Sequence, residues 1–162
     1  MTIFDYLPGI PRTYWKDYVK TIEPTKPLVI NAGERNIQLF PSNLTDKRGL
    51  ILEFLLTSNN PGIKFNLRID NRTISATLQQ IYEGGYYNYY IPDTPFISEY
   101  NTKDNEYTVN IIGQYPFRND VYVYADNLTT SPAVISAMGF RAIIFEPGFY
   151  KKLAELKSGK ED

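Results

Sequence analysis

The residues of this chain with the clearest capacity to contact another molecule are tyrosines. The segment Glu83–Phe96 reads EGGYYNYYIPDTPF, and it contains Tyr86, Tyr87, Tyr89 and Tyr90 in one short run. Successive side chains of an extended chain point to opposite sides, so a single core cannot bury all four rings. Exposed tyrosine rings stack on sugar faces and on partner proteins. The run is therefore interpreted as a solvated strand edge, a protein contact or a sugar-binding platform.

A second group of aromatic residues lies near the start of the chain, in residues 1–27. Its members are Phe4, Tyr6, Tyr14, Trp15 and Tyr18. Prolines punctuate the same segment, and each proline fixes φ and removes a backbone donor. We therefore expect an irregular arm rather than a regular strand, with a short helical turn around Arg12–Thr21. The rings of this arm pack either on their own domain or on a neighbouring subunit.

Several kinds of chemistry are excluded because the chain has no cysteine and no histidine. Disulfides, zinc–thiolate sites and thiolate nucleophiles need cysteine. Ser-His-Asp catalysis, imidazole metal sites and the usual general base near neutral pH need histidine. The acidic residues lack calcium-loop spacing, and no glycine-rich nucleotide motif occurs. We predict a non-enzymatic protein without metal or cofactor, and paired carboxylates are the one catalytic alternative left open.

The charge pattern argues against nucleic-acid and membrane partners. The chain has 17 Lys and Arg and 18 Asp and Glu, which are scattered and give a net charge of −1. Binding to nucleic acid or to anionic lipid needs a clustered basic face. No signal peptide and no apolar stretch of ~20 residues is visible, so a soluble, cytoplasmic chain is expected. Three Asn-X-Thr sequons, at Asn43, Asn71 and Asn127, are interpreted as chance.

The elements that would position these aromatic residues are β-strands. Leu50–Thr57 and Ile63–Asp70 both alternate between apolar and other residues, and we expect them to pair with each other. In the second strand, the apolar face is expected to consist of Ile63, Phe65, Leu67 and Ile69. In the first strand, one face is expected to consist of Leu50, Leu52, Phe54 and Leu56. One wet face and one dry face are typical of an antiparallel sheet.

Further short strands with frequent turn signals complete the pattern. They are expected at Leu28–Ile30, Asn36–Phe40, 107–111, 121–126 and 133–145, with a loop at 116–120 and an ambiguous strand or helical turn at 73–82. An amphipathic helix is expected at Phe149–Lys157. The prediction is an all-β fold, an antiparallel Greek-key or jelly-roll β-sandwich. It divides a single domain into an N-terminal arm (1–27), the sandwich (28–146) and a C-terminal helix and tail (147–162).

Two stretches of the sequence resemble the β-sandwich structural proteins of tailed phages and archaeal viruses. One runs from Leu52 to Ile69 and contains EFLLTSNNPGIKFNLRI, and the other is PFRNDVYVYADNLTTSPAVI at Pro116–Ile135. The resemblance covers about a third of the chain and transfers no catalytic residue. It implies a virion component, such as a minor capsid, decoration, portal-associated or tail-associated protein, that acts through contacts with other protein subunits and forms a homo-oligomer.

Two functions are therefore expected. The first is a non-catalytic assembly protein that uses the N-terminal aromatics, the Tyr86–Tyr90 run and the C-terminal helix for contacts. The alternative is a carbohydrate-binding module in which exposed tyrosines of the same run stack on a glycan.

Overall fold

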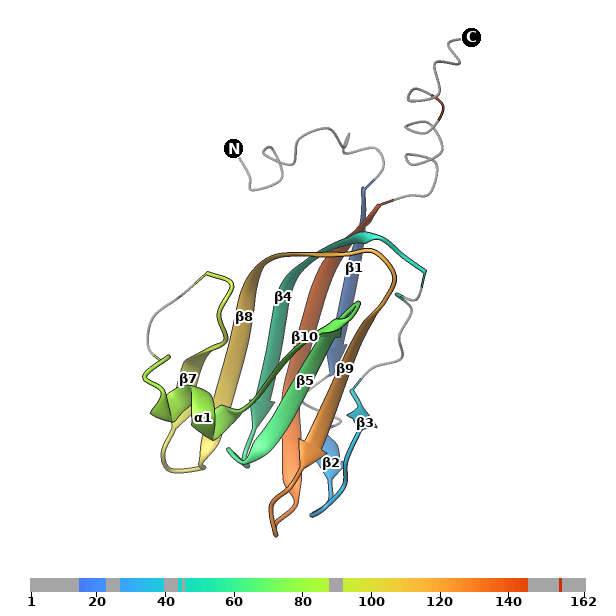
Figure 1. Cartoon of the computed structure of the whole chain (residues 1–162). Helices are drawn as coiled ribbons and strands as arrows, with labels where there is room; N and C mark the ends of the chain where they lie inside the picture. The colour runs from blue at the N-terminus through green and yellow to red at the C-terminus, as the bar shows by residue number, and fades with distance from the viewer. Residues whose placement is uncertain are drawn as a thin grey trace.

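The structure, a computed structural model, describes residues 15–22, 27–39, 44, 46–87, 92–145 and 155. In that part of the chain it contains ten β-strands and one short helix (Figure 1). The strands are β1 (Trp15–Ile22), β2 (Leu28–Ile30), β3 (Ile37–Gln38), β4 (Gly49–Ser58), β5 (Ile63–Ile69), β6 (Arg72–Thr77), β7 (Phe96–Asn101), β8 (Glu106–Phe117), β9 (Val121–Asn127) and β10 (Ala133–Phe145). The helix α1 is Leu78–Glu83. The expectation of an all-β chain is thus confirmed.

The strands form two antiparallel sheets. Sheet A has the order β1-β10-β4-β8-β7, and β2 also pairs with β10. Sheet B has the order β3-β9-β5-β6. The pairs are nested along the chain: β2 pairs with β10, β3 with β9, β4 with β8, and β5 with β6. Successive nested pairs alternate between sheets A and B. The chain therefore follows the path of one long hairpin that is folded across the two sheets.

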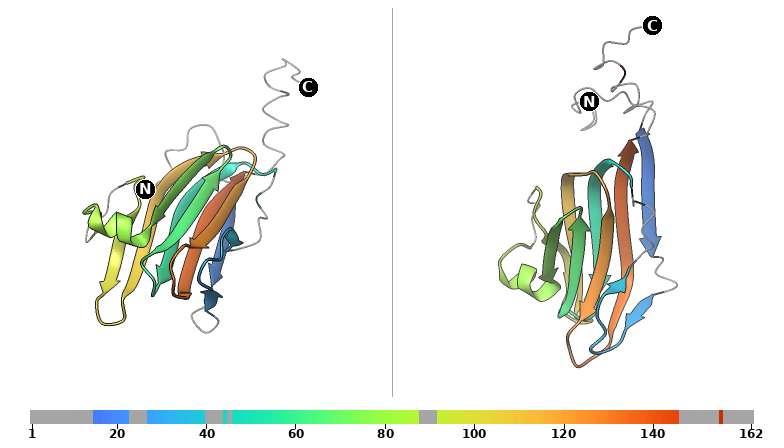
Figure 2. Two further views of the ribbon diagram at one scale, coloured as in Figure 1. Left: turned by 60° about the horizontal axis from the view of Figure 1, so that its bottom comes forward. Right: turned by 45° about the vertical axis from the view of Figure 1, so that its right-hand side comes forward.

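The hydrophobic core lies between the two sheets, which face each other as two layers (Figure 1, Figure 2). Phe54 of β4 and Phe65 of β5 contact each other across this core, with ring centroids 5.6 Å apart. The predicted apolar face of β5 is confirmed, because Ile63, Phe65, Leu67 and Ile69 are all buried. Strict alternation in a seven-residue strand placed these side chains on one face.

The predicted pairing of the strands at 50–57 and 63–70 is wrong. These strands are β4 and β5, and they belong to different sheets. A strand has two edges, and both edges of β4 are occupied by β10 and β8, while both edges of β5 are occupied by β9 and β6. The loop between them therefore crosses from one layer to the other. Asn60 shapes that loop, since its Oδ1 accepts from the Gly62 N–H at 3.0 Å.

The predicted faces of β4 are also partly wrong. The register of β4 against β8 shifts between Ile51 and Glu53, which indicates a β-bulge. A bulge adds one residue and inverts the alternation on one side of it. Ile51 therefore joins Phe54 and Leu56 in the core cluster, whereas Leu52 does not. The register shifts of β10 against β4 fall at 135–137 and 141–142, on either side of Gly139.

The N-terminal segment contains a regular strand where an arm with a helical turn was expected. Strand β1 pairs with β10 along its length, with Trp15 opposite Phe145 and Tyr18 opposite Ala142. No proline occurs between positions 12 and 23, so every residue of β1 keeps its backbone donor. The predicted C-terminal helix lies outside the described residues except for Glu155, and the division into arm, sandwich and tail stays a prediction.

Strand β6, helix α1 and strands β7 and β8 position the tyrosines that lie between residues 72 and 117. The ambiguous stretch divides into strand β6 and helix α1, and a capping box between Thr77 and Gln80 starts the helix. Strand β7 was not predicted, because FISEYN has no clear alternation. Strand β8 extends through Pro116 and Phe117, which were expected to lie in a loop. Only two residues of the strand predicted at 36–40 form β3.

Candidate interaction surface

The structure describes only part of the predicted aromatic set. Tyr86 and Tyr87 lie just after α1, and Trp15 and Tyr18 lie on β1, where the structure describes the backbone of these two residues. The residues that lie outside the described part are Phe4, Tyr6, Tyr14, Tyr89 and Tyr90. That these aromatic residues meet a partner stays a prediction for the whole set.

Tyr87 belongs to a cluster of four tyrosines, the tyrosine cluster, built from α1, β7 and β8. The Tyr82 ring stacks on Tyr87 at 4.6 Å and meets Tyr100 at 4.7 Å and Tyr107 at 5.6 Å. Tyr100 and Tyr107 lie 4.4 Å apart. Such ring pairs stabilise by about 0.5–1.5 kcal/mol beyond the area that they bury. The sequence run at 86–90 did not predict this cluster, because three of its members come from other elements.

The cluster is structural at its centre and exposed at its rim. Tyr107 is buried, and burial together with its hydrogen bond to Tyr100 raises the pKa of the Tyr107 phenol to about 12. The phenol is therefore protonated at neutral pH and does not serve as a base. Tyr86 and Tyr100 are 43% and 37% exposed. Tyr100 belongs to the cluster and Tyr86 precedes its member Tyr87, so another molecule can reach this side of the cluster at these two rings.

The tyrosines after α1 also cover part of the β7 edge. The Ile97 N–H donates to the Tyr86 carbonyl at 2.7 Å, and Tyr87 forms an isolated parallel bridge with Ile97. Between positions 78 and 107 the charged residues are Glu83, Asp93, Glu99, Lys103, Asp104 and Glu106. Five of these six are acidic, so this side of the molecule carries negative charge.

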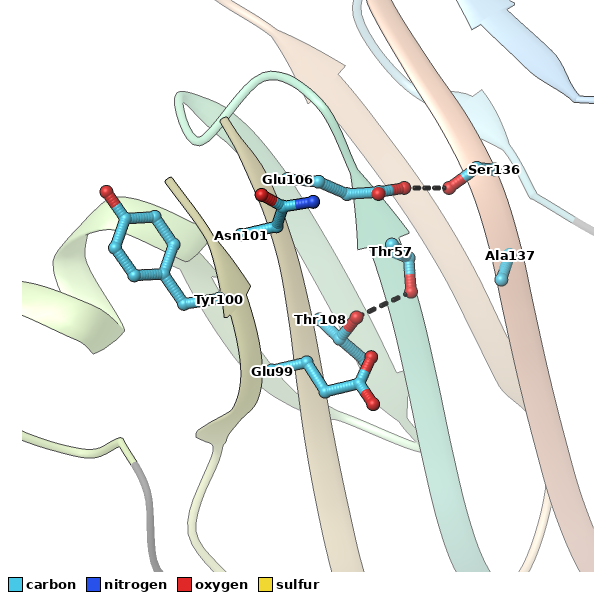
Figure 3. Close-up of a pocket in the computed structure, with 8 residues that line it drawn as sticks. All are labelled: Thr57, Glu99, Tyr100, Asn101, Glu106, Thr108, Ser136 and Ala137. Carbon is cyan, nitrogen blue, oxygen red and sulfur yellow. Dashed lines mark hydrogen bonds between the residues drawn. The ribbon is translucent and has the colours of Figure 1, made fainter. Parts of the chain in front are cut away.

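A hollow of about 560 Å³ lies on sheet A beside the tyrosine cluster (Figure 3). The Ser136 hydroxyl donates to Glu106 Oε1 at 2.7 Å, and the hydroxyls of Thr57 and Thr108 are 2.9 Å apart. Figure 3 shows the Tyr100 ring extending away from these polar groups. The hydroxyls of Thr57, Thr108 and Ser136 therefore all have hydrogen-bond partners within the hollow.

A second aromatic surface lies on the side of sheet B that faces away from the core. Tyr122 and Tyr124 of β9 lie 5.9 Å apart with nearly parallel rings, and the Arg68 guanidinium is 5.9 Å from the Tyr122 centroid. Asn66 Nδ2 donates to Asp126 Oδ2 at 3.1 Å on the same side. The sequence alternation placed Tyr122 and Tyr124 on one face, but only the β5–β9 register brings Arg68 opposite Tyr122.

A second hollow, of about 440 Å³, lies at the turn between β5 and β6. Asp70 has a φ of 53° there, and its carboxylate accepts from the backbone N–H groups of Arg118, Asn119 and Asp120 at 2.8–3.2 Å. Burial opposes ionisation, but these donors and the Arg72 charge outweigh it, so the pKa of Asp70 lies below its usual 3.8. This carboxylate holds the β8–β9 loop in place.

The described residues hold neither a cluster of metal-binding side chains nor a helix that could span a membrane. No group of three or more Asp, Glu, His or Cys side chains gathers there in a metal-binding arrangement. No helix in the same residues is long and apolar enough to cross a bilayer.

No family model matches the chain, and no curated protein matches it.

Proposed function

We propose that the two sheets form a jelly-roll β-sandwich, and that the chain is a non-catalytic structural protein of a virus particle. The observation that carries this proposal is the nested pairing of β2 with β10, β3 with β9, β4 with β8, and β5 with β6. A hairpin wound so that successive pairs alternate between two sheets is the jelly-roll arrangement, which is widely used by capsid proteins. The particle is then the place where the protein acts.

Two properties of the chain support contact rather than catalysis. The absence of histidine and cysteine removes the side chains that most often supply bases, nucleophiles and metal ligands. The exposed aromatic area at Tyr86 and Tyr100 lies beside an acidic surface. Tyrosine is enriched in protein interfaces, because a large ring is ordered at a low entropic cost.

The test uses the full chain and its natural particle. Peptides of the chain should band with virus particles in a density gradient of the source culture, as detected by mass spectrometry. The purified chain should also sediment as more than a monomer as its concentration rises. A chain that is absent from the particle band and monomeric at every concentration would contradict the proposal.

A carbohydrate-binding module is the alternative, and the outer side of sheet B favours it. Jelly rolls also occur in lectins. Tyr122, Tyr124 and Arg68 place two rings and a five-donor guanidinium together. The tyrosine run predicted for this role fits less well, since the Tyr87 ring is stacked on Tyr82. A glycan array with the wild type and with Tyr124→Ala tests the alternative, and a wild type without signal would eliminate it.

A further inference from the structure

The hollow at the β5–β6 turn contains polar side chains that the fold itself leaves without partners. Its volume of about 440 Å³ lies within the range of ligand sites, roughly 300–1,000 Å³. Its lining consists of two arginines, two asparagines and two aspartates: Arg68, Asp70, Asn71, Arg118, Asn119 and Asp120. The arginines and the asparagines are exposed, so another molecule can reach their donor groups.

The two guanidinium groups of this hollow are available to an anionic group. Arg68 Nε donates to the Asp70 carbonyl at 3.2 Å, which orients the guanidinium and leaves its terminal N–H donors without an acceptor among the described residues. The Arg118 side chain makes no hydrogen bond or ion pair in that part of the chain. The planar fork of a guanidinium matches the two oxygens of a carboxylate. Arg68 and Arg118 can therefore hold a carboxylate.

The two aspartates of the hollow have different roles. The Asp70 carboxylate accepts from the backbone N–H groups of Arg118, Asn119 and Asp120, so it is used within the fold and fixes the positions of these residues. The Asp120 carboxylate accepts no hydrogen bond from any described residue, and its Oδ1 is buried. A carboxylate in this situation requires a donor, such as a hydroxyl group.

The formal charges of the lining cancel, and this cancellation restricts the class of ligand. Two arginines face two aspartates, so a bare inorganic anion meets as much negative as positive charge. A molecule that carries a carboxylate on one side and hydroxyl groups on another satisfies both kinds of partner. Sugar acids have this combination of groups.

The aromatic surface of sheet B adjoins the hollow through Arg68. Strands β5 and β9 lie next to each other, with Arg68 opposite Tyr122 in the register (Figure 1). The Arg68 guanidinium is 5.9 Å from the Tyr122 ring centroid, and the Tyr124 ring lies 5.9 Å beyond at an interplanar angle of 16°. Aromatic rings contact the apolar faces of sugars. One surface therefore combines a carboxylate site, a hydroxyl acceptor and two rings.

We infer that this surface binds a glycan through a sugar residue that carries a carboxylate, an inference that rests on the carbohydrate-binding alternative and names its ligand class. Arg68 and Arg118 hold the carboxylate, and Asp120 accepts from a hydroxyl of the same sugar. Tyr122 and Tyr124 contact the next sugar along the glycan. A neutral sugar leaves both guanidinium groups unpaired, and an inorganic anion uses neither Asp120 nor the rings.

An array of matched glycan pairs tests the ligand class. Each pair consists of a glycan ending in glucuronic or sialic acid and the same glycan with its carboxyl group reduced to an alcohol. The wild type should bind the acidic member roughly tenfold more tightly, because hydrogen bonds to charged groups are the stronger ones. Inorganic phosphate at the glycan concentration should not compete. Equal binding of the two members, or competition by phosphate, would overturn the inference.

A substitution of Arg118 tests the site. Arg118→Gln should lose the preference for the acidic member and keep the binding of the neutral one. Its backbone N–H still donates to Asp70, so its melting temperature should match that of the wild type. The matched control is Arg35→Gln, which makes the same charge change at an exposed residue outside the lining of the hollow. A preference that persists in Arg118→Gln, or that disappears equally in Arg35→Gln, would overturn the site.

A substitution in the rings separates the two parts of the surface. Tyr124→Ala should weaken binding of the acidic and the neutral member by the same factor, so the ratio between them should stay at about ten. A variant in which this ratio falls to one would contradict the assignment of the carboxylate to the two arginines.

The outcomes also distinguish this ligand class from the proposed functions. Equal binding of acidic and neutral glycans refutes the sugar-acid site and leaves the carbohydrate-binding alternative intact. A wild type without signal on any glycan refutes both. The virion role is measured separately, by the density gradient.

Discussion

Replacing Asn127 by alanine removes a buried side chain that ties the β9–β10 loop to the end of β2. Asn127 has no exposed surface. Its Nδ2 donates to the carbonyls of Ile30 and Ser131 at 3.0 and 2.8 Å. Its Oδ1 accepts from the Thr129 N–H at 3.1 Å and from the Thr129 hydroxyl at 2.7 Å. The sequon at this position is thus used within the fold, and its amide nitrogen is not accessible to a glycosylating enzyme.

The expected loss of stability depends on which backbone groups lose a hydrogen-bond partner when Asn127 is replaced. The Ser131 carbonyl keeps donors from Asn60 and from the Thr129 hydroxyl. The Ile30 carbonyl and the Thr129 N–H lose the partner that Asn127 supplied. Each buried polar group left unsatisfied costs about 1–3 kcal/mol. Asn127→Ala should therefore lower the free energy of unfolding by about 2–4 kcal/mol.

Urea unfolding followed by fluorescence measures this loss. With a slope of roughly 2 kcal/mol per M, the midpoint should fall by about 1–2 M. Leu128→Ala is the matched control, because Leu128 is 51% exposed and its removal should change stability by less than about 0.5 kcal/mol. A change in Asn127→Ala as small as that of the control would refute the role assigned to the four hydrogen bonds.

Two other predictions concern the glycines and Asp70. Gly49→Ala should lower the free energy of unfolding by about 1–3 kcal/mol, since a Cβ there would clash with the Ile143 carbonyl oxygen. Gly139→Ala, whose Cβ would meet Leu55 at 3.8 Å, should keep a melting temperature close to that of the wild type. Because the folded-state pKa of Asp70 lies below 3.8, its carboxylate stabilises the fold above that value, and this stability is lost as the pH falls through the folded pKa. Asp70→Asn should therefore be less stable at neutral pH and lose less on acidification, as measured by urea titrations; equal acid sensitivity in wild type and variant would contradict this.

The alternation of apolar and polar residues along the sequence predicted those features that depend on one strand alone. The alternation in β5 predicted its buried face, because side chains in a regular strand alternate with period two. The same rule failed in β4, where a bulge inverted the faces of Ile51 and Leu52. A bulge depends on how two strands pair, and no residue type in the segment Ile51–Leu56 indicates it.

The candidate site was predictable only in part for the same reason. Tyrosine enrichment indicated an aromatic surface, and Tyr86 is exposed as expected. The stack of Tyr82, Tyr87, Tyr100 and Tyr107 needs α1, β7 and β8 to meet. Strand β7 itself was not predicted, so neither was the edge that it forms.

By itself, the amino-acid sequence determined which chemistries are excluded and where most strands occur. The absence of histidine and cysteine and the period-two alternation are properties of residue type and order. Only the tertiary structure decided that β4 and β5 lie in different layers, and that β1 and β7 are the two end strands in the order of sheet A. The physical reason is that backbone N–H and C=O groups are the same in almost every residue. They pair wherever side-chain packing brings two strands together, so the choice of neighbour depends on the whole core.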